Sequence, residues 1–232
     1  MQAIDERVAV PESRVGRAGV ISGGLHGPFD RALKRAMDVL IATLGLVFLS
    51  PLILSIAALV KLIDGGEVFY GQVRVGANGA PFRCFKFRTM RMDADECLAR
   101  WALEHPPLYQ EYLLTHKLRS DPRVTPIGTF LRSTSLDELP QLVNILLGEM
   151  SVVGPRPVVE KELVEFYGPA RALYESVRPG LTGLWQVSGR SNTTYEERVA
   201  LDEWYVRNWS FWVDFRIILK TFHVVLARKG AL

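Results

Sequence analysis

The hydrophobic and polar positions divide the chain into one apolar segment near its start and a long mixed segment after it. Residues 39–60 contain no charged side chain and read VLIATLGLVFLSPLILSIAALV. A straight helix of this length would extend roughly 33 Å, enough to cross a hydrocarbon core of about 30 Å. The pattern therefore predicts a membrane-embedded helix, preceded by a mobile polar tail over residues 1–29.

Ser50 and Pro51 lie at the middle of this apolar segment. Proline lacks the N–H of a helix hydrogen bond and its ring clashes with the preceding turn, so the helix should kink or break there. Each half would reach only about 16 Å, and a sharp break would return the chain to the face it entered. Basic residues flank both ends and assign neither to the outside. From these residues alone, a re-entrant helix-break-helix over residues 30–64 and a kinked spanning helix are equally favoured.

The remaining chain, residues 65–232, has the pattern of a small folded domain. Two strand-like segments, VFYGQVRVG and FRCFKFRTM, flank the turn-rich ANGAP and predict a short β-hairpin. Helical periodicity predicts helices over residues 92–118, 136–147 and 158–177. In the first of these helices we expect core positions at Trp101, Leu103, Leu108, Tyr112 and Leu113. The predicted fold class is thus α+β and mainly helical.

Residues 195–229 mix cationic side chains with many aromatic ones, namely Trp204, Trp209, Trp212, Phe215 and Phe222. Tryptophan suits a membrane interface because its ring is apolar while its N–H needs a polar partner. The same aromatic residues could equally fill the core of the domain. Amphipathic helices lying along the headgroups and helices with an aromatic core therefore both remain open.

Composition excludes several classes of protein. The formal net charge of +3 suits an anionic membrane surface or a phosphorylated substrate, but it suits many other proteins as well. Two cysteines, Cys84 and Cys97, and four scattered histidines predict neither a disulfide framework nor a structural zinc site. Basic residues are interleaved with acidic ones, so nucleic-acid binding is not predicted.

The segment LRSTSLDELPQLVNILLGEMSVVGPRP, residues 131–157, is rich in groups suited to phosphate chemistry. Ser135 and Glu138 have the spacing of a helix capping box, and acidic residues at a helix start are kept ionised by its dipole. The same helix end could bind an anionic phosphate beside the carboxylate of Asp137. Arg132 precedes this pair, and Arg156 lies between two prolines that fix its backbone. Capping and catalysis use the same geometry here and do not exclude each other.

Four blocks in order, FKFRTM, LRSTSLDELPQL, GPRP and RPGLTGLWQVSGR, resemble the bacterial sugar transferases. More narrowly, the chain resembles the polyprenyl-phosphate monotopic phosphoglycosyl transferases, and most of all the small forms that initiate exopolysaccharide with galactose 1-phosphate. The resemblance runs from about residue 30 to residue 232. It departs from the most compact members of the family at residues 97–117, which form a longer stretch here.

The resemblance implies transfer of galactose or glucose 1-phosphate from a UDP-sugar to undecaprenyl phosphate, on the cytoplasmic face of the bacterial inner membrane. It makes Asp137 the nucleophile, which releases UMP and forms a phosphoaspartyl sugar, and it associates Glu138 with Mg²⁺. It places Lys86, Arg132 and Arg156 around the phosphates and the break of a re-entrant helix at Ser50-Pro51, which favours the hairpin over a span. The resemblance leaves the sugar, the polysaccharide pathway and homo-oligomer formation open.

Two other functions compete with this interpretation. Asp93 and Asp95 form a D-x-D sequence, which holds a metal–nucleotide-sugar complex in many classical glycosyltransferases. Acidic residues at a helix start are more often surface charges that complement the helix dipole. The second alternative is a non-catalytic membrane scaffold for polysaccharide enzymes, against which the full set of matched polar residues argues.

Overall fold

A computed structural model describes residues 27–115, 118, 121–189 and 193–226, so most of the expected tail and residues 227–229 lie outside the described part. The described chain is mainly helical, as predicted, and contains two small two-stranded sheets, of which only the β-hairpin was predicted. Its longer elements are α1 (Pro28–Asp64), β1 (Phe69–Val75), β2 (Pro81–Phe87), α2 (Ala94–Glu104), α3 (Pro106–Thr115), α4 (Pro126–Thr134), α5 (Gln141–Leu147), α9 (Tyr195–Arg207) and α10 (Phe211–Leu226). The shorter ones are η1 (Ala77–Gly79), η2 (Leu136–Glu138), β3 (Ser151–Val153), α6 (Glu160–Glu162), η3 (Leu163–Tyr167), η4 (Gly168–Ala170), α7 (Arg171–Glu175), β4 (Gly180–Thr182) and α8 (Leu184–Ser188).

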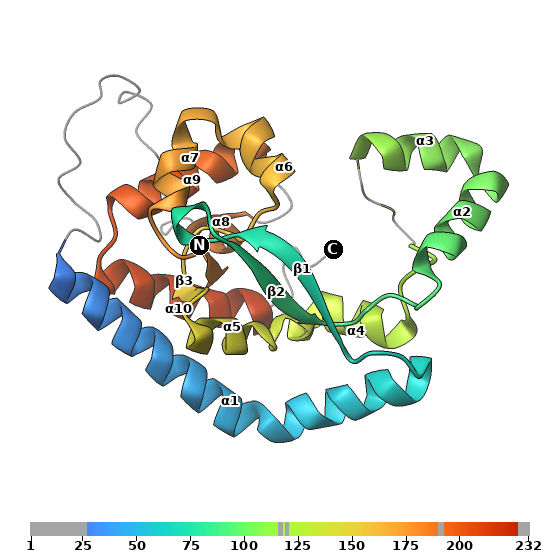
Figure 1. Cartoon of the computed structure of the whole chain (residues 1–232), viewed down its shortest axis with the longest axis horizontal. Helices are drawn as coiled ribbons and strands as arrows, with labels where there is room; N and C mark the ends of the chain where they lie inside the picture. The colour runs from blue at the N-terminus through green and yellow to red at the C-terminus, as the bar shows by residue number, and fades with distance from the viewer. Residues whose placement is uncertain (1–26, 116–117, 119–120, 190–192, 227–232) are drawn as a thin grey trace, which may run out of the picture.

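Helix α1 is one long helix that bends near its middle and curves around the rest of the molecule (Figure 1). Pro51 lies inside the helix and cannot donate to the carbonyl of Val47, four residues earlier. The Ser50 hydroxyl donates to this carbonyl instead, at 2.8 Å. The proline therefore bends α1 without ending it, because the neighbouring serine replaces the missing hydrogen bond.

Both halves of α1 pack against the same folded domain. In the N-terminal half, Ala42 is buried in a cluster with Ile145 of α5 and Ile217 of α10. In the C-terminal half, Ile56 and Val60 are buried in a second cluster with side chains of β2 and α4. The bend thus lets one helix contact the domain on both sides of Pro51.

A buried polar network fixes the start of α1. The Lys34 ammonium donates to Asp214 of α10 at 2.7 Å, and the Tyr205 hydroxyl donates to the other oxygen of that carboxylate at 2.8 Å. One turn further along α1, Asp38 accepts the backbone N–H of Val152 at 2.9 Å. Removing one partner of a buried ion pair costs about 3–5 kcal/mol of folding free energy, so this network anchors α1 firmly.

The predicted β-hairpin is present. Strands β1 and β2 pair antiparallel over their whole length, with Tyr70 opposite Lys86, Gln72 opposite Cys84 and Arg74 opposite Phe82. These positions share one face of the hairpin, because side chains alternate along a strand. Register therefore brings Arg74 and Lys86 to the same face.

The second sheet pairs β3 with β4 in parallel. The GPRP segment follows β3 directly and continues along β4. The N–H of Gly154 donates to the carbonyl of Thr182 at 2.9 Å, and the N–H of Gly180 donates to that of Pro155 at 2.7 Å. The two glycines approach so closely that a Cβ on Gly154 would lie 2.8 Å from the backbone nitrogen of Gly180. This close approach requires glycine and sets the position of Arg156.

The helix predicted over residues 92–118 is two helices, α2 and α3, which break at His105 before the two prolines that follow. They project from the main body (Figure 1). Two of the five predicted core positions are wrong: Leu103 is 82% exposed and Leu108 is exposed. Trp101 and Tyr112 are partly buried, and the side chain of Leu113 lies outside the described part. The described chain covers this amphipathic face only in part, since Arg123 lies over the Tyr112 ring.

Two further predicted helices are interrupted. The segment 136–147 is the 3₁₀ turn η2 followed by α5, with Pro140 between them. The segment 158–177 changes from α6 to the π-helical turn η3, the 3₁₀ turn η4 and then α7. Gly168, at φ 43°, precedes a proline at this last change, and both residues disfavour a continuous helix.

The aromatic residues of the C-terminal helices divide between the two expected roles. Trp209 is only 8% exposed and belongs to the core, whereas Trp212 is 66% exposed on α10. Phe215 and Phe222 are also exposed on this helix. The segment thus supplies both an aromatic core and an apolar outer face.

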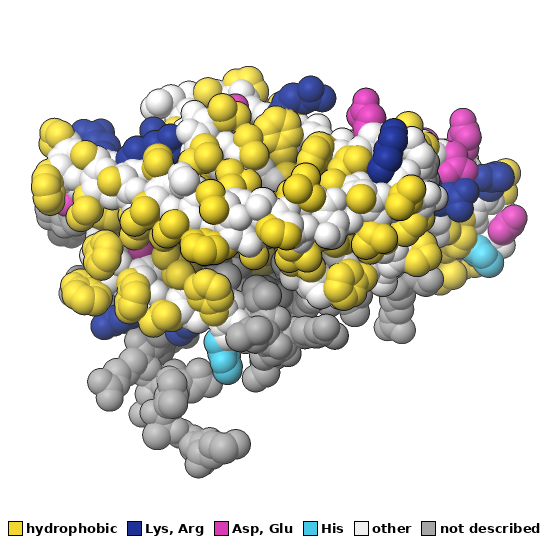
Figure 2. Space-filling model, turned by 90° about the horizontal axis from the view of Figure 1, so that it is seen from below, with side chains coloured by type: hydrophobic (Ala, Val, Ile, Leu, Met, Phe, Trp, Pro, Cys, Tyr) yellow, Lys and Arg dark blue, Asp and Glu magenta, His cyan; other side chains and the backbone are white. Residues whose placement is uncertain are grey.

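Many of the exposed apolar side chains gather on one face of the molecule. Seen from the side of α1, hydrophobic side chains cover most of the visible surface (Figure 2). Its large exposed members on α1 and α10 include Leu40, Leu44, Phe48, Leu54, Leu62, Phe211, Trp212, Leu219 and Phe222. Helix α1 alone among the described segments has the length and apolar composition to cross a bilayer, and only 11% of its most apolar window is buried. An apolar helix left this exposed indicates membrane association, since the core helix of a soluble protein would be covered.

Candidate active site

The acidic pair Asp137-Glu138 lies in the tight turn η2 between α4 and α5. Ser135 ends α4 in the left-handed conformation, at φ 58°, with its N–H bonded to the carbonyl of Arg132. The Ser135 side chain makes no capping hydrogen bond, so the predicted capping box is wrong. The residue that would begin a new helix is already used to end the previous one. The capping interaction predicted for Ser135 is therefore absent.

Lys86 of β2 reaches this turn from the hairpin. Its ammonium lies 2.6 Å from Oε1 of Glu138 and 3.8 Å from Oδ2 of Asp137. Asp137 is buried, while Glu138 and Lys86 are half-buried. The structure thus brings together three of the predicted site residues, from segments about fifty positions apart in the chain.

Burial changes the titration of these groups. It raises the pKa of Asp137 to about 6, against an opposing effect of Lys86 and with a further contribution from Glu138. The helix dipole that was expected to keep this carboxylate ionised therefore does not bring its pKa below the ordinary value. Burial alone would lower the pKa of Lys86, but Glu138 and Asp137 outweigh it, so the pKa of Lys86 is raised. At neutral pH, Asp137 is mostly ionised beside a charged lysine.

The two predicted arginines lie on different sides of Asp137. Arg132 is exposed on α4, donates to the Thr89 hydroxyl at 2.9 Å and acts electrostatically to lower the pKa of Asp137. Arg156 is exposed with its guanidinium 5.6 Å from the centre of the Trp185 ring. Neither arginine forms an ion pair within the described chain, so each can offer its charge to a ligand.

Two other side chains lie near Arg156. The carboxylate of Asp202, buried in α9, accepts the hydroxyl of Tyr167 at 2.9 Å and lies close enough to Arg156 for the arginine's charge to oppose the raising of its pKa by burial. On the other side of Trp185 the guanidinium of Arg198 lies 4.8 Å from the ring centre. These contacts, together with the flanking prolines, set the direction in which Arg156 points.

A polar pocket brings together Lys86, Glu138 and Arg156, but Asp137 and Arg132 are not in its lining. Its described lining residues are Arg74, Cys84, Lys86, Glu138, Gln141, Arg156, Pro157, Gly180, Leu181 and Gln186. Sequence reasoning missed Arg74, Gln141 and Gln186. Arg74 could have been found from the hairpin register, because it alternates onto the face that carries Lys86. The pocket has a cationic wall beside a carboxylate turn, which suits a phosphorylated ligand.

The donor set is compatible with a magnesium ion. Within the described chain no three Asp, Glu, His or Cys residues converge in a protein-built metal cage. Mg²⁺ normally binds one or two carboxylates together with substrate phosphates and water, and the adjacent carboxylates of Asp137 and Glu138 fit this pattern.

The D-x-D sequence takes no part in this pocket. The Asp93 carboxylate is bonded to the guanidinium of Arg91 at 2.9 Å and paired with that of Arg100 at 3.4 Å. It lies at the start of α2, on the projecting arm, and is absent from the pocket lining. Asp93 and Asp95 are therefore placed as surface charges, which removes the structural basis for the glycosyltransferase alternative.

A polar pocket lined by lysine and arginine, with the buried carboxylate of Asp137 next to its Lys86, suits an enzyme that transfers a phosphorylated group, and the exposed apolar helix α1 indicates membrane association. The family model of the bacterial sugar transferases matches residues 29–228. The chain belongs to this family.

Three relatives show how the family divides. The chain is 53% identical over 208 residues to the exopolysaccharide production protein ExoY of Rhizobium meliloti, covering 90% of this chain and 92% of that protein. It is 47% identical over 211 residues to the undecaprenyl-phosphate galactose phosphotransferase of Salmonella typhimurium, covering 91% of this chain and 44% of that protein. It is 38% identical over 213 residues to the UDP-glucose:undecaprenyl-phosphate glucose-1-phosphate transferase of Escherichia coli, covering 87% of this chain and 42% of that protein. The longer relatives thus contain a further part that this chain does not match.

Proposed function

We propose that the protein transfers a hexose 1-phosphate, galactose or glucose, from a UDP-sugar to undecaprenyl phosphate and releases UMP, as the first step of exopolysaccharide assembly. The observation that carries this proposal is the buried carboxylate of Asp137 beside Lys86, which lines a pocket with a cationic wall. The relatives named for galactose and glucose transfer support both the lipid acceptor and the sugar class.

The reaction proceeds in two displacements at one phosphorus atom. In the first, an oxygen of the Asp137 carboxylate attacks the phosphorus that carries the sugar, and the bond to the UMP oxygen breaks with its electron pair on UMP. In the second, a phosphate oxygen of the lipid attacks the same phosphorus. The bond to Asp137 breaks, and the carboxylate returns with undecaprenyl-diphosphate-sugar as product.

The surrounding residues stabilise charge during these steps. Lys86 lies close enough to both carboxylates to orient Asp137 and to attract the phosphoryl oxygens. Arg132 and Arg156 provide charged hydrogen bonds to the phosphates. Glu138 would hold the Mg²⁺, which when bound neutralises charge on the pyrophosphate.

We also propose that α1 is re-entrant, with the catalytic domain and the chain start on the cytoplasmic face of the bacterial inner membrane. A spanning helix leaves its two ends on opposite sides of the bilayer. Both halves of α1 pack against one domain, so a span would draw that domain into the hydrocarbon. A bent helix embedded from one side avoids this cost.

Replacing Pro51 with leucine tests this topology. The new N–H would complete the helix ladder at Val47, so the apolar segment would straighten and some molecules would span the membrane. We expect a cysteine placed in the tail to become partly accessible to an impermeant thiol reagent from outside the cell. In the protein that keeps Pro51, the same cysteine should react only after the cells are lysed. Labelling of that cysteine in intact cells would contradict the re-entrant topology.

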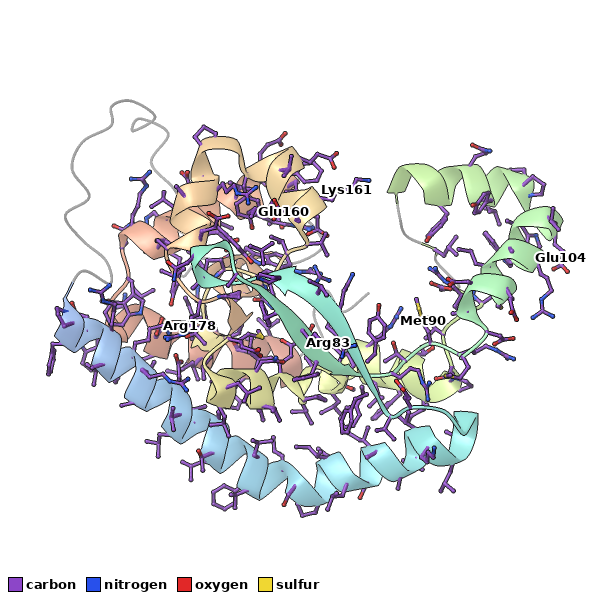
Figure 3. The ribbon with its side chains drawn as sticks, in the orientation of Figure 1. Arg83, Met90, Glu104, Glu160, Lys161 and Arg178 are labelled. Carbon is purple, nitrogen blue, oxygen red and sulfur yellow. The ribbon has the colours of Figure 1, made fainter. Side chains whose placement is uncertain are left out.

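Arg156→Lys tests the phosphate clamp. The planar guanidinium can form two parallel hydrogen bonds to a phosphate, which an ammonium cannot. Loss of one charged hydrogen bond, about 1.5–3 kcal/mol, predicts a rate lower by about tenfold or more. Initial rates of UMP release measure this, with Arg178→Lys as a control on an exposed arginine that binds the carbonyl of Gly148 (Figure 3). Normal kinetics for Arg156→Lys would make Arg156 structural.

The overall reaction is tested by incubating purified protein with undecaprenyl phosphate and a panel of UDP-sugars. We expect UMP release with UDP-galactose or UDP-glucose that depends on the lipid over repeated turnovers. Release of UDP would instead indicate a classical glycosyltransferase. No turnover with any nucleotide sugar would favour a scaffold.

A further inference from the structure

Arg74 is a charged residue of the pocket lining. It belongs to none of the four sequence blocks that resemble the family, and the proposed reaction gives it no role. It lies on β1, and its side chain is only 11% exposed. One N–H donates to the carbonyl of Pro157 at 3.2 Å and another to the side-chain oxygen of Gln72 at 2.6 Å. A guanidinium has five N–H donors, so these two bonds leave three for a ligand.

Arg74 and Arg156 both line the same pocket. The Pro157 carbonyl that binds Arg74 belongs to the residue after Arg156. Burial lowers the pKa of Arg74, and the positive charge of Arg156 lowers it further. Two like charges held this close repel each other, and the repulsion is relieved when an anion lies between them.

The nearby carboxylates do not balance this charge. Glu162 is 4.0 Å from Arg74, at the limit of an ion pair, and its other oxygen accepts the Tyr195 hydroxyl at 2.8 Å. Glu138, the carboxylate of the pocket lining, is 2.6 Å from Lys86. The Lys86 side of the pocket, with Glu138 and Asp137 beside the lysine, thus carries no net positive charge, whereas the Arg74–Arg156 side does.

We propose that Arg74 and Arg156 form a second phosphate subsite, which holds the nucleotide phosphate that leaves as UMP while the sugar phosphate lies against Asp137 and Lys86. This assignment rests on the proposed function, because a pyrophosphate substrate has two phosphate groups to place. It divides the pocket into a reacting half and a leaving-group half. It also makes Arg74 a substrate-binding residue that no sequence block identified.

The test compares UMP and uridine binding to full-length protein in detergent by calorimetry. Arg74→Gln should weaken UMP binding by about 10- to 100-fold and leave uridine binding unchanged, because only the phosphate contact is lost. It should also raise KM for the UDP-sugar. Arg83→Gln is the matched control, since Arg83 lies on β2 of the same hairpin, is exposed and alternates onto the opposite face (Figure 3).

Each outcome separates the possibilities. Equal UMP affinity in Arg74→Gln and the unchanged protein would overturn the subsite, as would a parallel loss of uridine and UMP affinity, which indicates a collapsed pocket. If Arg74→Gln does not fold, Arg74→Lys keeps the charge and should show a smaller loss specific to UMP. Failure of the unchanged protein to bind UMP would contradict the proposed function itself.

Discussion

Replacing Asp137 with asparagine is expected to abolish sugar-phosphate transfer while leaving the fold intact. The amide has nearly the same shape, and the η2 turn depends on backbone bonds rather than on the carboxylate. It is a far poorer nucleophile, so the loss should be at least about 10³-fold, equivalent to roughly 4 kcal/mol. Removal of the buried negative charge also leaves Lys86 paired with Glu138 alone.

The measurement that distinguishes nucleophile from binding residue uses no lipid acceptor. Unchanged protein incubated with UDP-sugar labelled in the sugar and then quenched should carry one label per molecule and release a burst of UMP. Asp137→Asn should show neither, yet should bind UMP with normal affinity. Asp93→Asn, on the projecting arm, is the control and should keep the burst. A full burst in Asp137→Asn would contradict the covalent route.

The membrane helix and the hairpin could be predicted because both depend on local patterns. An uncharged run of this length has few folded alternatives, and the turn between two strand-like segments fixes their pairing. The conformation of the helix at Pro51 was harder to predict from the sequence. Whether a helix breaks or bends depends on what satisfies the freed carbonyl, and the Ser50 hydroxyl does so at Val47. The sequence shows a serine next to the proline, but its hydroxyl could form a hydrogen bond in a broken helix as well as in a bent one.

The misjudged elements have a common cause. Ser135 and Glu138 have the right spacing for a capping box, but Ser135 already ends α4 in a left-handed conformation that spacing does not reveal. Leu103 has the periodicity of a core residue, but periodicity defines a face without showing whether another element covers it. Local pattern identifies which interactions a segment can make, and tertiary packing selects among them.

The candidate site shows the same division. The types of residue around Asp137 could be proposed from the sequence, and the structure brings Lys86 and Glu138 to it. The pKa of Asp137 could not be predicted from the sequence, because it is set mainly by burial, which is a property of the packed chain. Arg74 was missed for a related reason: its contact with the Pro157 carbonyl joins residues more than eighty positions apart.

Lys86→Met should give the second large effect and a characteristic pH dependence. Methionine fills a similar volume without the charge, so Asp137 would lose the cation that now opposes the effect of burial. The pKa of Asp137 should therefore rise above its present value of about 6. Since only the ionised carboxylate attacks, the acid limb of kcat/KM should begin near pH 6 in the unchanged protein and at higher pH in the variant.

We expect the variant to be slower by at least about tenfold at neutral pH and to recover part of that loss at alkaline pH, where Asp137 ionises again. A series of rates from pH 5 to 9 measures both effects, and Lys86→Arg, which keeps a positive charge, should hold the acid limb near that of the unchanged protein. Burial of an unpaired carboxylate also costs stability, but in Lys86→Met this cost should diminish as the pH falls and Asp137 binds its proton. If Lys86→Met lowers the rate but leaves the acid limb of the kcat/KM profile at the same pH, Lys86 contacts the phosphates without controlling the ionisation of Asp137.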